Sequence, residues 1–146
     1  MVKDNYNISR FIEAQEGIYP IALRELQEGH KRSHWMWYIF PQLKGLGRSY
    51  NANYYGISRT DEASEYLATP ILGQRLREAS NAILNLPTDD AVEVFGGIDS
   101  RKLKSSMTLF DLVSPNDIFA RVLDKYFNGI RDNHTISIIQ SKNGTI

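Results

Sequence analysis

HWMWYIFPQLKGLGRS, residues 34–49, places two tryptophans, a tyrosine and a phenylalanine before Pro41 and follows them with a basic loop that contains glycines. The aromatic run fits either an extended strand or a buried helix. Pro41 ends whichever of the two forms, because the residue before a proline avoids the helical region. Large flat side chains next to a flexible cationic loop predict a pocket whose mouth favours an anion.

This segment also supplies most of the candidate ligand-binding residues. Trp35 and Trp37 offer flat faces for a stacked ring, and the loop offers backbone amides, charge and a hydroxyl for a phosphate. The loop residues in this prediction are Lys44, Gly45, Gly47, Arg48 and Ser49. His34 can donate to a phosphate or act as a general acid, and a structural or surface histidine is its alternative. For the loop, the alternative is a solvated surface. No Walker sequence or dinucleotide fingerprint occurs.

A second candidate segment is KLKSSMTLF, residues 102–110. On a helix, Lys102 lies one turn before Ser105 and Ser106, so these three side chains fall on neighbouring faces that can approach an anion. A serine–lysine nucleophile pair is an alternative at this spacing, but an oxyanion site is not recognisable. A solvated helix face is the other alternative.

Glu62 is the candidate catalytic carboxylate. It follows the proposed binding loop at the start of a predicted helix, where it either caps the helix or faces a ligand. Asp132, near His134, is expected to be a hydrogen-bonded anchor of the C-terminal region. The three histidines are widely spaced and lack the pairing of a helical metal site, so no metal is predicted, and no cofactor is implied.

Composition limits the classes of protein and partner. The 146 residues, 42% of them hydrophobic, suit one globular domain that spans the chain, residues 1–146. With 17 basic and 17 acidic residues there is no global field for broad nucleic-acid binding, so an anion has to be held locally. Cysteine is absent, and neither a signal peptide nor a membrane span is recognisable. We therefore expect a cytoplasmic protein that does not contact a membrane.

Apolar periodicity predicts a mainly α fold, with α+β as the alternative: several helices and a few short strands in one compact domain. Helices are expected over residues 7–29 with a break, and over 61–67, 70–84, 89–95, 99–112 and 114–127. Gly96 and Gly97 separate two of them. Short strands are expected at 54–57 and near the C-terminus, where residues 136–146 combine a strand with a polar tail.

Taken as a set, these motifs resemble a known family. Arg10 with Phe11, the segment 34–49, Glu62 with Ala63, and the segments 102–110 and 123–129 are similar to the domain of unknown function 1810, whose members are sometimes labelled calpastatin. The resemblance covers nearly the whole chain and implies a compact, mainly helical domain, with no activity attached. A folded aromatic-rich domain is unlike a flexible protease inhibitor.

A more distant likeness links parts of the chain to the NAD- and ADP-ribose-associated N-glycosidases. It implies an ADP-ribose-type substrate, a stacking tryptophan, Lys44, Arg48 and Lys102 near phosphates, and Glu62 as the carboxylate. The leading hypothesis is binding of an ADP-ribose-like or other phosphorylated nucleotide, to sense or sequester it. The alternatives are an N-glycosidase or related hydrolase acting on such a ligand, and a protein-interaction module with an exposed apolar patch.

Overall fold

The computed structural model describes residues 6–142, and within this range the chain forms nine helices and no sheet. They are α1 (Ser9–Gln15), α2 (Tyr19–Glu28), α3 (Met36–Ile39), α4 (Tyr50–Tyr54), α5 (Thr60–Ala68), α6 (Pro70–Leu84), α7 (Ala91–Val113), α8 (Ile118–Phe127) and α9 (Asn133–Lys142). The prediction of a mainly α, compact single domain is therefore confirmed.

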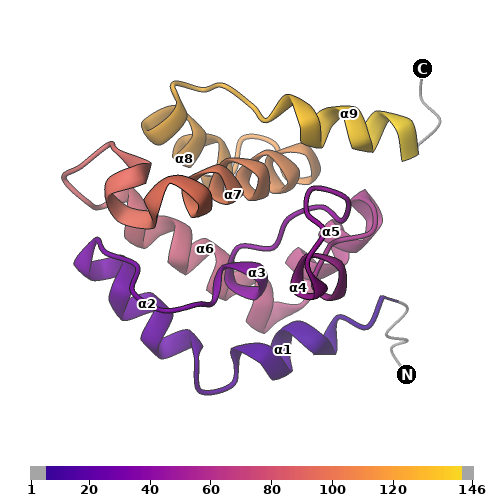
Figure 1. The fold of residues 1–146 in the computed structure, drawn as a ribbon, viewed down its shortest axis with the longest axis horizontal. Coiled ribbons are helices and arrows are strands. Elements are labelled where there is room, and N and C mark those ends of the chain that lie inside the picture. The colour runs from indigo at the N-terminus through magenta and orange to yellow at the C-terminus, as the bar shows by residue number, and fades with distance from the viewer. Residues whose placement is uncertain (1–5, 143–146) are drawn as a thin grey trace.

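The longer helices pack around α6 and α7. Helix α6 contacts α1, α2, α5 and α8, and α7 contacts α5, α8 and α9. In Figure 1, α7, α8 and α9 form the upper half of the molecule, and α1 and α2 lie along its lower edge. The short helices α3 and α4 lie between these halves, so the segment that contains them can contact both.

Aromatic side chains connect the helices through the core. The ring of Phe11 on α1 meets Tyr66 on α5 edge to face at 5.0 Å, Tyr66 lies 5.5 Å from Phe110 on α7, and Phe110 lies 5.7 Å from Phe119 on α8. All four are fully buried. Because burying one such side chain contributes about 1.5–3 kcal/mol, this column is a main source of cohesion between the two halves.

Several helix boundaries follow local signals in the sequence. Pro20 and Pro70 stand in the first turns of α2 and α6, where a missing backbone N–H costs nothing. Gly29 and Asn128 end α2 and α8 in the left-handed conformation. Gly96 has a φ of 83° and breaks the geometry of α7, which matches the expected separation of two helical segments.

The aromatic run and its loop form a compact unit. Residues 36–39 form α3, so the buried-helix alternative holds for the run. The chain then turns back on itself, and Leu43 pairs with Ile57 in an isolated parallel bridge through the bonds Ile57 N to Gln42 O, 2.9 Å, and Lys44 N to Ile57 O, 2.8 Å. Gly56 is required beside this bridge, because a Cβ there would lie 2.6 Å from the carbonyl oxygen of Ala52.

Both predicted strands are wrong. Within the segment 54–57, Tyr54 ends α4 and only Ile57 takes part in a β-bridge. At the C-terminus, residues 136–142 belong to α9, and 143–146 lie outside the described residues. The β-branched composition of this stretch is overridden because Asp132 caps the helix and Thr135 is fully buried in its first turn.

Candidate functional site

The predicted ligand-binding residues divide between two cavities, each of which we name by one residue. The Trp37 cavity has a volume of about 390 Å³. Its lining consists of Trp37, Gln42, Leu46, Gly47, Ile98, Arg101, Lys102, Ser105, Asp132 and His134. Four of these, Trp37, Gly47, Lys102 and Ser105, are predicted residues, and they come from the two candidate segments, 34–49 and 102–110. The fold brings the aromatic run, the glycine loop and the segment 102–110 to one cavity.

Lys102 lies over the ring of Trp37. Its Nζ is 4.2 Å from the ring centroid and 3.2 Å from Oδ1 of Asp99, and Asp99 also accepts an ion pair of 2.8 Å from Lys31. Burial opposes ionisation of Asp99, but the ammonium groups of Lys31 and Lys102 outweigh it and lower the pKa of this carboxyl. The carboxylate thus holds the Lys102 ammonium against the aromatic face, in a cation–π contact.

Asp132 fixes the other wall of the Trp37 cavity. Its Oδ2 accepts hydrogen bonds from the Ser105 hydroxyl, 3.0 Å, and from the backbone N–H of Thr135, 3.1 Å. Its own N–H donates to Oγ1 of Thr108 at 2.9 Å. These bonds tie the start of α9 to α7 and bring His134 to the cavity, which confirms the prediction of Asp132 as a hydrogen-bonded anchor.

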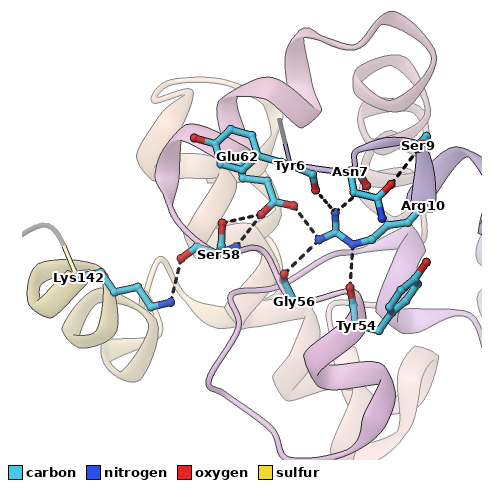
Figure 2. A network of polar contacts seen from close by, with 9 residues as sticks. All are labelled: Tyr6, Asn7, Ser9, Arg10, Tyr54, Gly56, Ser58, Glu62 and Lys142. Carbon is cyan, nitrogen blue, oxygen red and sulfur yellow. Dashed lines mark hydrogen bonds and ion pairs between the residues drawn. The ribbon is translucent and has the colours of Figure 1, made fainter. Parts of the chain in front are cut away.

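The Glu62 cavity is larger, about 660 Å³. It is lined by Tyr6, Asn7, Arg10, Lys44, Tyr50, Asn53, Tyr54, Gly56, Ser58 and Glu62, and shares no lining residue with the Trp37 cavity. Figure 2 shows the polar network along its wall. Lys44 and Glu62, both predicted site residues, meet here, so Lys44 is separated from Lys102, and Arg48, the third predicted cation, lines neither cavity.

Arg10 is the centre of that network. Nε donates to the carbonyl of Tyr54 at 2.7 Å, and Nη1 donates to the carbonyls of Tyr6 and Asn7 at 2.7 and 2.8 Å. Nη2 donates to the carbonyl of Gly56 at 3.2 Å and to Oε2 of Glu62 at 2.7 Å (Figure 2). A guanidinium has five N–H groups, and here each of them has a protein acceptor.

Glu62 is 2% exposed and held on both oxygens. Oε2 pairs with Arg10, and Oε1 accepts from the backbone N–H and the hydroxyl of Ser58, both at 2.8 Å. The carbonyl of Ser58 in turn accepts from Nζ of Lys142 at 2.9 Å (Figure 2). Glu62 therefore lines a cavity and receives two hydrogen bonds from Ser58, two residues before α5. That it faces a ligand stays a prediction.

Trp35 does not reach either cavity. Its ring is 1% exposed, and its Nε1 donates to Oε1 of Glu25 at 2.9 Å. A ring enclosed in this way offers no face to a ligand, so the predicted stacking role does not fit its position. Trp37, two residues further on, is only partly buried, because the short helix α3 directs the two side chains differently.

The remaining predicted residues also lie outside the two linings. They are His34, Gly45, Arg48 and Ser49, all exposed, and Ser106, which is fully buried. Ser49 caps α4 by accepting from the Ala52 N–H at 3.1 Å, so its hydroxyl has a structural role. Ser106 lies in the core on α7, out of reach of a ligand in either cavity.

Several lining residues were missed from the sequence. In the Glu62 cavity they are Tyr6, Asn7, Arg10, Tyr50, Asn53, Tyr54, Gly56 and Ser58, and in the Trp37 cavity Gln42, Leu46, Ile98, Arg101, Asp132 and His134. The spacing of Tyr50 and Tyr54 is a usable signal, because residues four apart share one helix face. Arg10 gives no local signal, since the sequence separates it from Glu62 by 52 positions.

Across residues 6–142, no three His, Asp or Glu side chains gather in a way that could hold a metal ion. In the same described range, none of the helices has the length and apolar character needed to cross a membrane.

Comparisons with known proteins place the chain in a family. The chain is similar over 93% of its length to the crystal structure of the conserved hypothetical protein Rv1873 from Mycobacterium tuberculosis, with 42% identity, a TM-score of 0.91 and 98% of that chain covered. No curated protein matches the chain. The model of the family described as "Protein of unknown function (DUF1810)" matches residues 5–139. The chain therefore belongs to the DUF1810 family.

Proposed function

We propose that this protein binds a phosphorylated nucleotide of the ADP-ribose type in the Trp37 cavity, and that it senses or sequesters this ligand. The observation that carries the proposal is the convergence of Trp37, Gly47, Lys102 and Ser105 on one cavity. A nucleotide needs a flat face for its base together with hydrogen-bond donors and positive charge for its phosphates, and this lining contains both.

The charges along the lining favour an anion. The lining contains two cations, Arg101 and Lys102, and one carboxylate, Asp132. The Asp99 carboxylate that pairs with Lys102 is shared with Lys31, so the site and its ion pairs together keep a net positive charge. Its volume of about 390 Å³ is at the lower end of the range for small-molecule sites. We expect a base to take the Trp37 face that Lys102 now covers, and the displaced ammonium to contact a phosphate.

The first test is titration of the protein with ADP-ribose, followed by calorimetry and by tryptophan fluorescence. Trp37→Ala should raise the dissociation constant by about ten- to a hundredfold, since base stacking is worth ~1–3 kcal/mol. Lys102→Met should raise it about tenfold. Lys104→Met is the matched control, because Lys104 lies on the same helix and outside both cavity linings. Equal affinity of Trp37→Ala and the parent protein would contradict the proposal.

A second candidate function, hydrolysis of an N-glycosidic bond, is favoured by one separate observation. A buried carboxylate, Glu62, lines a cavity of about 660 Å³ together with Lys44. Its Oε2 pairs with Arg10 at 2.7 Å, and a carboxylate lining a cavity suits activation of a water molecule or stabilisation of a cationic sugar.

This candidate is tested by incubating the protein with ADP-ribose, NAD and simple nucleotides and separating the products by chromatography. Release of a free base by the parent protein and its loss in Glu62→Gln, with the melting temperature checked for folding, would support it. Intact ligand after prolonged incubation with the parent protein would exclude it for these substrates, whatever the variant does.

A further inference from the structure

We infer that the Glu62 cavity is a second ligand site, for a nucleoside monophosphate: a planar ring joined to a hydroxyl-bearing sugar and one anionic group. The site is separate from the Trp37 cavity, since the two linings have no residue in common. Binding there does not depend on the Trp37 proposal, and it requires no turnover of the ligand.

The charge that recognises the anion comes from Lys44. All five N–H groups of Arg10 already donate to protein acceptors, so its guanidinium has no donor left for a phosphate. Arg10 and Glu62 also neutralise each other at 2.7 Å. Of the charged lining residues this leaves Lys44, for which no ion pair is described within residues 6–142.

The position of Lys44 is defined even though its side chain is exposed. Its backbone N–H donates to the carbonyl of Ile57 at 2.8 Å, within the bridge that closes the loop. Gly56 packs directly against it, because a Cβ on Gly56 would lie 2.7 Å from Cβ of Lys44. The backbone of Lys44 is therefore already fixed at the cavity, and only its side chain has to be ordered when the ammonium binds an anion. This limits the conformational entropy lost on binding.

The aromatic face comes from α4. The rings of Tyr50 and Tyr54 are stacked, with centroids 5.6 Å apart and planes 9° apart, and Tyr54 in turn packs edge to face on Tyr55 at 4.8 Å. Tyr50 is 75% exposed and forms the outer end of this column, with Tyr54 as its one described ring neighbour in residues 6–142. A planar ring can extend the column on the free face of Tyr50.

The remaining polar groups suit sugar hydroxyls, which donate hydrogen bonds. Nδ2 of Asn53 donates to the carbonyl of Ser49 at 3.1 Å, which leaves its Oδ1 as an acceptor. The carboxylate of Glu62 accepts three hydrogen bonds and has capacity for about four. The cavity thus offers the ring of Tyr50 to the base, the oxygens of Asn53 and Glu62 to the sugar hydroxyls, and Lys44 to the phosphate. These are the three parts of a nucleoside monophosphate.

The test is a titration of the isotope-labelled protein with adenosine monophosphate, followed through the backbone amide resonances. We expect saturable shifts at Asn53, Gly56 and Ser58. Lys44→Met should weaken binding about tenfold, to the level of adenosine, which lacks the phosphate. Tyr50→Ala should weaken adenosine monophosphate and adenosine alike. Lys104→Met, outside both linings, should bind as the parent does.

The outcomes separate this inference from the proposal for the Trp37 cavity. Shifts confined to Gly47, Ser105 and Asp132 would overturn the second site and leave the Trp37 site standing. Shifts confined to Asn53, Gly56 and Ser58 would support the second site and count against the Trp37 site. Absence of shifts at Asn53, Gly56 and Ser58 at millimolar ligand overturns the inference, as does a Lys44→Met variant that binds adenosine monophosphate as tightly as the parent.

Discussion

The indole Nε1 of Trp35 donates a hydrogen bond of 2.9 Å to the carboxylate of Glu25, a buried residue on α2. The same carboxylate accepts from the backbone N–H of Arg32 at 2.8 Å and from the hydroxyl of Ser33 at 2.6 Å. Burial alone raises the pKa of Glu25, but these hydrogen bonds to the ionised form outweigh it and lower the pKa from 4.5 to about 2.

This pKa makes Glu25 a source of acid-sensitive stability. The stabilisation is complete above pH 4.5, the ordinary value, and is lost as the pH falls to about 2. At neutral pH we expect the unfolding free energy of the parent protein to be about 3 kcal/mol higher than that of Glu25→Gln. This difference should become smaller as the pH falls from 4.5 to about 2. Urea unfolding across a pH series measures it. Glu28→Gln, at an exposed ion pair on the same helix, should cost less than about 1 kcal/mol. A difference between parent and Glu25→Gln that stays constant with pH would contradict the view that the ionised Glu25 carboxylate is the source of this stability.

Two glycines provide a paired test of local packing. A Cβ at Gly56 would lie 2.6 Å from the carbonyl oxygen of Ala52, whereas a Cβ at Gly97 would meet no atom within 4 Å. Gly56→Ala should therefore lower the unfolding free energy by about 1–3 kcal/mol. Gly97→Ala should leave it unchanged or raise it by up to about 1 kcal/mol, because alanine favours a helix. Thermal melting of both variants decides this, and equal effects would show that the loop at Gly56 adapts freely.

Arg10 and Glu62 form a buried pair whose loss is expected to be costly. Arg10→Met leaves the Glu62 carboxylate without its counter-charge, which should reduce the unfolding free energy by about 3–5 kcal/mol. Arg10→Lys should restore little of it, since an ammonium cannot reach acceptors arranged around a planar fork. The control is Arg59→Met, at a pair with Asp61 that is more than half exposed. A loss below about 1 kcal/mol in Arg10→Met would refute the view that the pair organises the Glu62 cavity.

Asp132 should govern the stability of α9. Removing its side chain in Asp132→Ala takes away the acceptor for Ser105 and for the N–H of Thr135, at an expected cost of about 1–2 kcal/mol. Amide hydrogen exchange should accelerate along residues 136–139 in particular. Asp124→Ala, at an exposed position of α8, serves as the control. Unchanged exchange in α9 would show that burial of Thr135, and not the cap, holds the helix.

Local chemistry accounts for the part of the fold that was predictable. Proline in a first turn and glycine or asparagine after a last turn act within a few residues, so α2, α6 and α8 could be placed from the sequence. The C-terminal strand was wrongly predicted because the preference of β-branched residues for strands is weak. The helix cap from Asp132 and the burial of Thr135 override it.

The candidate sites depended on contacts that a linear pattern does not contain. Trp35 and Trp37 look equivalent in the sequence, but Trp35 is enclosed in the core with its Nε1 bonded to Glu25, ten positions before it. Lys44 and Gly47 look like one basic loop, but they line different cavities. Glu62 was identified without Arg10, since the two are 52 positions apart in the sequence and meet only in the folded chain.

Arg10 also bears on the order in which the chain folds. Three of its acceptors, on Tyr54, Gly56 and Glu62, lie 44, 46 and 52 positions away. The chain therefore has to lose the conformational entropy of closing these loops before the hydrogen bonds can form. The Tyr54 and Gly56 carbonyls lie at the end of α4 and beside the Leu43–Ile57 bridge, so we expect them to reach the guanidinium together after these two features have formed. A contact completed after the rate-limiting step slows unfolding and barely affects refolding. We therefore expect Arg10 to act mainly on the unfolding rate, and so on the lifetime of the native state, and little on the refolding rate.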